Sequence, residues 1–398
     1  MNLSSGELKR VFKVAETLRP QLMEIALEIW RHPELAFKEK RASGLLQSFL
    51  TAEGFEVEER LAGMKTAFRA RLICKRPRPA IGFLAEMDAL PGLGHACGHN
   101  LIGTASAGAA ACLRRALPVL AGSVEAIGCP AEESGGGKVR LVRAGVFDRL
   151  DAALLVHPDR KTEIFKLSLA LLEVKLSFQG KAAHASAEPE KGINALDAVI
   201  RTFNGVDAFR LGIPENARIN GIITDGGVAA NIIPERAEAV FYVRAQTMKE
   251  TQALAKKLVA CARSAAHATG ARVRADVKTR QAYAPFIPNR ALGRVFERNL
   301  VSMGIEIEQG PEDQALGSTD VGNVSQRVPT ISPTLRIGGL RAAAHSPGFA
   351  RAAGSKAGME MMMQAVKALA LTGAVVLKDA RLRREMRREF RSAVEGNK

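Results

Sequence analysis

The spacing of apolar residues changes twice along this chain, and this limits the possible folds more than any other feature. Between residues 72 and 158, short apolar runs end in Gly, Pro, Asp or His, as over residues 80–85, 124–129 and 152–156. Strands that are buried on both faces of a parallel sheet show such runs, with helices between them. This part of the chain is therefore predicted to be α/β.

From residue 172 apolar and polar residues alternate strictly, so that Val174, Leu176 and Phe178 share one face of a strand. The elements predicted after it are helix, strand, strand, helix and strand, over residues 193–210, 218–223, 238–244, 250–267 and 273–277. The order β-α-β-β-α-β is that of the ferredoxin-like motif, an antiparallel sheet with both helices on one face.

The α/β pattern returns after Pro285. The smaller domain is therefore predicted to be inserted into the larger one. We expect residues 1–171 and 286–398 to form the larger domain in two parts, and residues 172–285 to form the insert. The length of 398 residues also favours more than one domain.

Composition limits where such a protein works. No stretch of 18 apolar residues is present, so we expect no membrane span, and the first thirty residues have the pattern of amphipathic helices rather than of a targeting segment. The five cysteines are odd in number and scattered. We therefore expect no disulfide framework and a cytoplasmic location.

The formal net charge of +16 makes nucleic-acid binding a hypothesis to weigh. The excess is spread along the chain, however, and the tail over residues 378–398 holds eight basic and four acidic residues, so it supplies only four of the sixteen charges. No nucleic-acid motif accompanies the basic stretches. We favour a solvated basic surface that attracts a small anionic substrate, with no nucleic-acid partner.

Candidate chemical groups follow the predicted parallel strands. Cys97 and His99 come after the strand over residues 80–85, with Gly98 between them to permit a sharp turn. Glu132 and Glu133 follow the strand over residues 124–129. In open α/β sheets, binding sites form at the carboxyl ends of the strands. Taken alone, however, a Cys-x-His pair is more often structural, and adjacent glutamates more often begin a solvated helix.

Two further histidines complete the pattern. His157 ends the apolar run over residues 152–156, and His345 lies in a Ser-Pro turn much later in the chain. Each alone is more often structural than functional. Thiolate, imidazole and carboxylate together are the ligands that suit Zn and, to a lesser degree, Mn. Of the other histidines, we expect His32 and His267 to be structural, and His95 to lie near the metals without binding them.

These residues resemble the aminoacylase and carboxypeptidase-G-like di-metal peptidases, peptidase family M20. The resemblance extends from residues 32–35 through residues 317–320 to His345, and its most specific part is the stretch over residues 94–100. Asn100 stands where many relatives have Asp, a variant that resembles the aminobenzoyl-glutamate hydrolase and β-alanyl-lysine dipeptidase branch. The resemblance implies a three-layer catalytic domain with an inserted domain that acts as a lid and pairs two chains into a homodimer.

The resemblance also implies a role for each matching residue. Two divalent ions, Zn or Mn, would share Cys97 as a bridging ligand. His99 and His157 would complete one ion, and Glu133 and His345 the other. Glu132 would be the general base, and Asp88 would orient a ligand.

In the insert, the resemblance implies that His184 stabilises the oxyanion, in the site of a neighbouring subunit. Asn231 would bind substrate by hydrogen bonds. Arg244 is a candidate for binding a substrate carboxylate, with a plain surface residue as the equal alternative.

The implied reaction is hydrolysis of an amide C–N bond by a metal-bound hydroxide. The substrate would be a small carboxylate-bearing N-acyl amino acid, aryl amide or dipeptide. Two alternatives remain open: an aminohydrolase that displaces ammonia from an activated aromatic amine, and a non-catalytic family member that only binds its ligand.

Overall fold

The computed structural model describes residues 3–308, 310 and 317–396. Contacts divide the chain into two compact units. The first unit comprises Met1–Leu167, Phe286–Gln314 and Asp320–Lys398, and the second comprises Ser168–Pro285 and Ala315–Thr319. The second unit thus begins at Ser168 rather than at residue 172, and it includes a short later segment that the sequence patterns assign to the larger domain.

The first unit is built on a six-stranded sheet, whose parallel part positions the candidate site. Its spatial order is β1 (Glu56–Glu59), β2 (Phe68–Cys74), β4 (Gly122–Cys129), β3 (Ala80–Glu86), β5 (Ala152–Leu154) and β11 (Thr330–Ile331). Strands β3, β4, β5 and β11 are parallel, whereas β1 and β2 are antiparallel to their neighbours. A parallel pair, β6 (His157–Asp159) and β12 (Thr334–Arg336), follows β5 and β11 in the chain.

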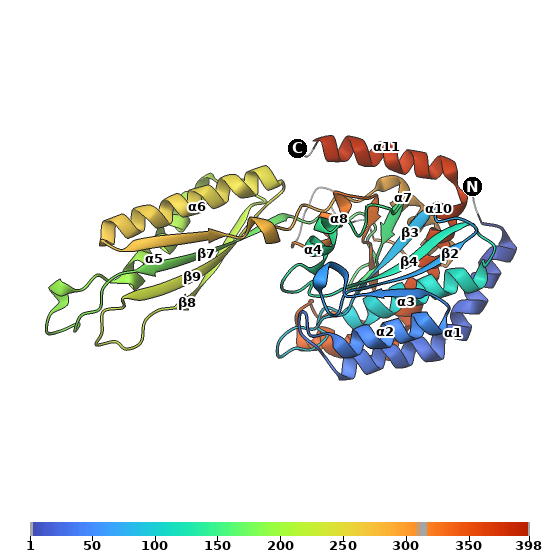
Figure 1. The fold of residues 1–398 in the computed structure, drawn as a ribbon, viewed down its shortest axis with the longest axis horizontal. Coiled ribbons are helices and arrows are strands. Elements are labelled where there is room, and N and C mark those ends of the chain that lie inside the picture. The colour runs from blue at the N-terminus through green and yellow to red at the C-terminus, as the bar shows by residue number, and fades with distance from the viewer. Residues whose placement is uncertain (1–2, 309, 311–316, 397–398) are drawn as a thin grey trace. The chain divides into compact units, whose positions relative to one another are not determined.

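Helices cover both faces of this sheet, so the unit has three layers (Figure 1). The larger core includes residues of α1 (Ser5–Arg31), α2 (Lys40–Ala52), α3 (His99–Ala116), α7 (Arg290–Ser302) and α10 (Lys356–Lys378). The smaller core on the other face includes residues of α4 (Gly137–Arg143) and α8 (Val321–Ser325). Two more helices are α9 (Pro347–Ala353) and α11 (Ala380–Gly396).

Strand β3 shows why the sequence forms this layered arrangement. All of its residues are buried. Ile81, Phe83 and Ala85 belong to the larger core, while Ala80 and Leu84 belong to the smaller one. Because successive side chains point to opposite faces of a sheet, an unbroken apolar run is stable only where both faces are covered.

Helix α10 is long and apolar enough to cross a membrane by length and composition alone. Its most apolar 18-residue stretch, however, is 83% buried inside the protein. Val366, Leu369 and Val376 from this helix belong to the larger core. This is the burial of a core helix packed between neighbouring helices and the sheet.

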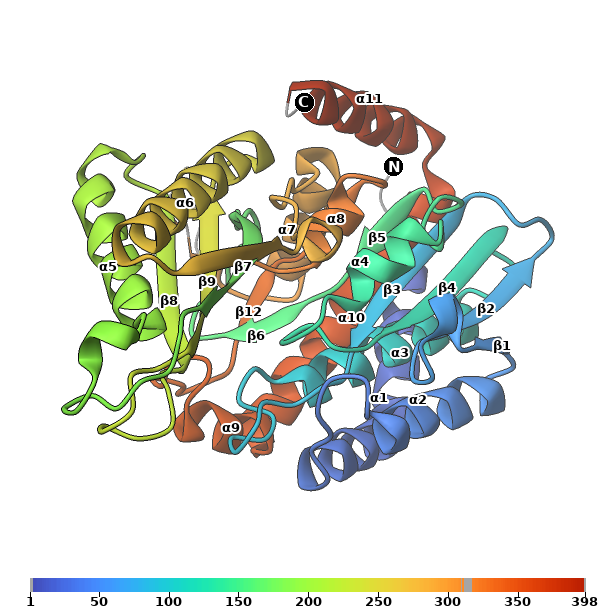
Figure 2. The ribbon, with the colours of Figure 1, turned by 60° about the vertical axis from the view of Figure 1, so that its left-hand side comes forward.

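The second unit has the predicted order of elements. These are β7 (Ala170–Gln179), α5 (Ala195–Phe209), β8 (Arg218–Asp225), β9 (Arg236–Ala245), α6 (Met248–Thr269) and β10 (Arg272–Val277). The sheet has the order β10-β7-β9-β8, and every pair is antiparallel. Figure 2 shows both helices on one face of the sheet, where they share a core with β7 and β9. The predicted ferredoxin-like fold is confirmed.

Two details of the sheet in the first unit differ from the prediction. The chain over residues 68–74 forms an antiparallel strand, although we assigned apolar runs from residue 72 to a parallel sheet. The run over residues 152–156 is not one strand, because β5 ends at Leu154 and His157 begins β6. The interruption lets the chain pair with β11 first and then with β12.

Candidate metal centre

The five predicted metal ligands belong to the first unit, and each follows one of its parallel strands in the chain. Cys97 precedes α3, and His99 is the first residue of that helix. Gly98 between them has a positive φ of 78°, and a Cβ atom there would come within 2.5 Å of Pro158 Cγ. Only glycine accepts both the left-handed backbone and this close approach. The turn therefore places Cys97 and His99 next to the strand that begins with His157.

The potential ligand atoms form two groups that share one thiol. The first group is Cys97, His99 and His157, and within it Cys97 Sγ lies 3.3 Å from His157 Nε2. The second group is Cys97, Glu133 and His345, and within it His345 Nε2 lies 3.3 Å from Glu133 Oε2. In each group the ligand atoms all lie within 4.8 Å of one another. This geometry suits two ions bridged by one thiolate.

Backbone contacts hold the ligands from distant parts of the chain together. The N–H of His345 donates to the carbonyl of Ala96 at 2.9 Å, which fixes the late loop beside Cys97. His345 has a φ of 61°, and Ala131, just before the two glutamates, has a φ of 59°. Non-glycine residues with positive φ are strained, and such residues cluster at functional sites.

Asp88 connects the two candidate ligand groups. One of its oxygens lies 3.0 Å from His99 Nδ1, and the other accepts the N–H of Glu133 at 3.0 Å. The contact with Nδ1 leaves Nε2 of His99 as the nitrogen that faces the other ligands. Although burial lowers the pKa of His99, the Asp88 carboxylate raises it above its usual value.

These residues fit a metal ion because some of their buried polar atoms are not satisfied by the protein itself. Among the described residues, His99 Nε2 and Glu133 Oε1 are buried without a hydrogen-bond partner. Burying polar atoms in that way is costly unless a ligand binds them. Burial also raises the pKa of the Cys97 thiol far above its usual range, so a cation is needed to make it a thiolate.

Glu132 lies beside the ligands, and one of its oxygens is 3.9 Å from His99 Nε2. Burial raises the pKa of its carboxyl group well above the usual value, and the carboxylates of Glu86 and Asp320 raise it further. A carboxylate with a raised pKa beside the candidate metal ligands is suited to accept a proton from water near neutral pH.

Sequence patterns did not reveal Lys138, which lies next to this carboxylate cluster. Its ammonium group is completely buried, 2.7 Å from Glu86 and 2.6 Å from Asp320. Asp320 belongs to the stretch over residues 317–320 that carries part of the family resemblance, and Glu86 lies two positions before Asp88, but neither was predicted to have a role. The one available signal was a lysine directly after the glycine run that follows the two glutamates.

The remaining histidines of this unit lie where we expected structural residues. His95 is buried near the ligands, but its Nε2 atom contacts the carbonyl of Ile29 at 3.0 Å. Burial lowers the pKa of His95 to about 4, which keeps the ring neutral. His32 contacts the carbonyl of Glu28 at the end of α1.

The other predicted residues, His184, Asn231 and Arg244, belong to the second unit. Nδ1 of His184 accepts the N–H groups of Ser186 and Ala187 at 3.3 and 3.2 Å, so Nε2 carries the proton of the neutral ring. Asn231 lies on the adjacent segment, where its carbonyl accepts the N–H of Ala185 at 2.9 Å. His184 therefore presents a donor next to Asn231.

Arg244 is far from these two residues in the same chain. It lies near the end of β9, stacks over Tyr242 and donates to Ser318 Oγ at 3.2 Å. The His184 loop is joined to the other end of this strand, because Gly180 donates to Glu235 just before Arg236. The eight residue-to-residue steps from Arg236 to Arg244 span roughly 26 Å.

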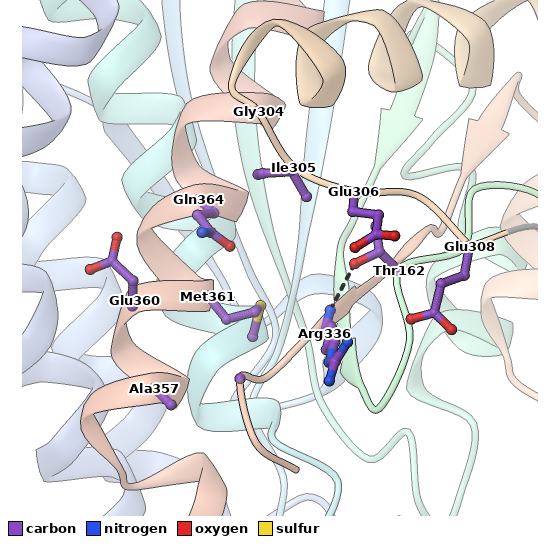
Figure 3. Close-up of a pocket in the computed structure, with 11 residues that line it drawn as sticks. Thr162, Gly304, Ile305, Glu306, Glu308, Arg336, Ala357, Glu360, Met361 and Gln364 are labelled. Carbon is purple, nitrogen blue, oxygen red and sulfur yellow. Dashed lines mark hydrogen bonds between the residues drawn. The ribbon is translucent and has the colours of Figure 1, made fainter. Parts of the chain in front are cut away.

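A separate groove of about 370 Å³ lies on the first unit (Figure 3). It is lined by residues around Arg336, Glu306 and Glu360 rather than by the candidate ligands. Glu360 is paired with Arg19 at 2.8 Å, and the Arg336 N–H donates to Thr162. We assign no function to this groove.

Comparisons with known proteins agree with this geometry. Residues 170–270 match the family model of the peptidase dimerisation domain. The chain is 39% identical to the Xaa-Arg dipeptidase of Mus musculus, over 96% of this chain and 91% of the relative. It is 35% identical to a subunit of the p-aminobenzoyl-glutamate hydrolase of Escherichia coli, over 73% of this chain and 64% of that subunit.

A solved structure shares the fold over almost the whole length. It is a dinuclear metal-binding peptidase of the M20 family from Bacillus subtilis, with a TM-score of 0.67 and 20% identity. The match covers 91% of this chain and 99% of the other. The predicted architecture, a three-layer di-metal peptidase-like domain with an inserted domain, is confirmed.

Proposed function

Because the chain belongs to the M20 peptidase family and is a metal-dependent amidohydrolase, we propose that it is a dipeptidase. Its substrates are small dipeptides with a free carboxylate, among them dipeptides that end in arginine. The observation that carries this proposal is the pair of ligand groups that share Cys97. The similarity to the Xaa-Arg dipeptidase supports the substrate class, because it covers nearly the whole chain.

In this proposal Cys97, His99 and His157 hold one divalent ion, and Cys97, Glu133 and His345 hold the other. The ions supply the Lewis acidity that activates water and polarises the scissile carbonyl. Glu132 accepts the proton of the attacking water and returns it to the leaving amine. Asp88 keeps His99 and the Glu133 loop in place.

Thiolate and imidazole ligands favour zinc, and manganese is the second candidate. All five cysteines are free thiols in the structure. This supports the proposed cytoplasmic location, where a reduced Cys97 remains available as a ligand.

Two side chains of the second unit contact substrate in this proposal. The Nε2–H group of His184 donates a hydrogen bond to the oxyanion of the tetrahedral intermediate. Such a donor typically stabilises the transition state by about 3–4 kcal/mol. Arg244 binds the carboxylate of the substrate. A dipeptide spans roughly 7 Å, while β9 separates these residues by roughly 26 Å in one chain. One substrate molecule therefore contacts both only if they come from different chains.

This separation supports a homodimer as the active form, as does the match to a peptidase dimerisation domain. Light scattering on the purified protein should give the mass of two chains. A concentration-dependent loss of specific activity on dilution into monomers is expected, and a monomer with full activity would contradict the dimeric site.

The first test is metal content together with product analysis. Wild type and Glu132→Ala should both hold two ions per chain by mass spectrometry. Only wild type should release free amino acids from a panel of dipeptides, with p-aminobenzoyl-glutamate as a comparison substrate. Release of ammonia from aryl amines without dipeptide hydrolysis would favour the aminohydrolase alternative, and a metal-free wild type would refute the proposed centre.

A further inference from the structure

Lys138 is a buried cation in the first unit that the proposed reaction does not yet use. Its side chain is 0% exposed. Its Nζ atom lies 2.7 Å from Glu86 Oε1 and 2.6 Å from Asp320 Oδ1. A lysine is almost never buried in this way unless it is paired, because removing its charge from water is costly.

Lys138 belongs to a cluster with three carboxylates, two of which it contacts directly. Glu86, Glu132 and Asp320 each present an oxygen within 4.8 Å of the others. Carboxylates this close repel one another, so they remain together as anions only beside a positive charge. The second oxygen of Glu86 lies 3.6 Å from His99 Nε2. Glu86 therefore connects this cluster of carboxylates to the candidate metal ligands.

The backbone connects Lys138 to the loop that carries Glu132. The N–H of Lys138 donates to Asp320 Oδ2 at 2.9 Å, so Asp320 holds both the backbone and the side chain of this residue. Gly136 donates to the carbonyl of Ala131 at 3.0 Å. A Cβ atom at Gly137 would come within 1.8 Å of Pro130 O, so the loop is closed tightly on itself. Asp320 therefore anchors the far end of the loop.

We propose that Lys138 and Asp320 are positioning residues for the hydrolytic reaction. They hold the carboxylate of Glu132 in the orientation that accepts the proton of the attacking water. The inference rests on the proposed function, in which Glu132 is the general base. In this proposal neither Lys138 nor Asp320 binds substrate or metal.

The opposite end of the same sheet offers a matched control. Asp151 is a carboxylate with a side chain 1% exposed, and it accepts the N–H of Ala80 at 2.9 Å and the Arg78 guanidinium at 3.0 Å. It thus has the same kind of partners as Asp320, a backbone N–H and a cation. It lies before β5, at the amino end of the parallel strands, whereas the candidate ligands follow the carboxyl ends.

The first experiment compares Asp320→Asn and Lys138→Met with Asp151→Asn. Substitutions that misplace a supporting group typically cost roughly 10- to 100-fold in activity, and we expect a fall in kcat of about that size in the first two variants. Their KM should change less than about twofold, since substrate contacts are untouched. Metal content should stay at two ions per chain, and kcat of Asp151→Asn should equal that of wild type.

The second experiment places Lys138→Met and Asp320→Asn in the Glu132→Ala background. A residue that acts only through Glu132 has nothing left to position, so neither substitution should lower the residual rate further. Equal fold losses in both backgrounds would overturn the inference, because a general loss of structure does not depend on Glu132. Asp320→Asn keeps the shape of the side chain, so it tests the inference even if Lys138→Met does not fold.

The outcomes separate this inference from the proposed function. An active wild type with unchanged kcat in Asp320→Asn overturns the positioning role alone. A wild type that holds two metals and hydrolyses no dipeptide overturns the proposed function instead.

Discussion

Buried charged groups lie at both ends of strand β3, but the cations that pair with them differ in their exposure to water. At the amino end, Asp151 bonds to Ala80 and to the guanidinium groups of Arg78 and Arg387. These arginines are half-exposed, at 54% and 49%. At the carboxyl end, Lys138 and its carboxylates are almost fully buried. The amino end joins α11 to the sheet, while the carboxyl end surrounds the candidate metal centre.

The difference shows how the surroundings of a buried carboxylate decide its use. Cations that reach water can be rehydrated when their partner is lost, so the Asp151 cluster serves stability at moderate cost. A cation without access to water depends on its carboxylates entirely. A group held by buried partners on several sides has few alternative positions, which is what the proposed general base Glu132 would require.

Among the substitutions that test the difference between the two ends of the sheet, Cys97→Ala should have the largest effect, which is on metal binding. Cys97 belongs to both ligand groups, so its loss should release both ions. Metal affinity should fall by more than the roughly 10- to 100-fold typical of supporting residues. Mass spectrometry after dialysis measures this.

The matched control is Cys112→Ala, which removes another buried thiol. Cys112 lies late in α3, on the helix that begins beside the metal ligands. Its Sγ contacts the carbonyl of Val11. This variant should keep both metals, and loss of metal in it would mean that the thiol of Cys97 has no special role.

The two buried aspartates should differ in stability. Asp320→Asn should lower the free energy of unfolding by about 3–5 kcal/mol, because the buried Lys138 keeps only Glu86 as a contacting carboxylate and cannot reach water. Asp151→Asn should cost only about 1.5–3 kcal/mol, since Arg78 and Arg387 can be solvated. Urea denaturation of both variants gives the comparison. Equal losses would show that exposure of the partner does not control the cost.

Alanine substitutions at two glycines near the candidate metal ligands should separate the cost of backbone strain from the cost of steric crowding. Gly92 and Gly98 both have positive φ, of 70° and 78°. Only Gly98 has an atom, Pro158 Cγ, where a Cβ would lie. Gly92→Ala should cost about 1–2 kcal/mol. Gly98→Ala should cost roughly 1–3 kcal/mol more and should also weaken metal binding. Calorimetric melting with and without added zinc tests both variants.

The smallest expected effect is the pH dependence of the stability that Asp151 contributes. Burial alone would raise the pKa of Asp151, but its hydrogen bonds to Ala80, Arg387 and Arg78 outweigh burial and lower the pKa. A lowered pKa in the folded state gives stability that is present above the unfolded value, about 3.9, and is lost as the pH falls through the folded value. The stability difference between wild type and Asp151→Asn should therefore shrink below about pH 4, and a constant difference would contradict this origin.

Sequence patterns predicted the second unit best. Its strands are covered on one face only, so alternation marks them clearly, and helices α5 and α6 lie within two residues of the predicted limits. In the first unit the antiparallel strand β2 was missed. Its burial alternates over Phe68, Ala70 and their neighbours, and an apolar run alone does not report the direction of a strand.

The candidate ligands were found because parallel strands bring the residues that follow them to one edge of a sheet. This placement made Cys97, Glu133 and His157 candidates, and the resemblance to the family implied that they bind metal together. Lys138 could not be found in this way. A lysine at the start of a helix is usually solvated, and its burial depends on Asp320, which lies 182 positions later in the chain.

The left-handed backbone at Ala131 has a consequence for stabilising this protein by mutation. Glycine there would relieve strain of about 1–2 kcal/mol, but it would add a comparable entropy cost of roughly 0.5–1 kcal/mol in the unfolded chain. Selection for thermal tolerance alone would thus barely distinguish the two residues. Selection for turnover would distinguish them, because alanine narrows the conformations open to the adjoining Glu132. At position 131, therefore, selection for catalytic rate favours alanine, whereas selection for thermal stability favours neither residue strongly.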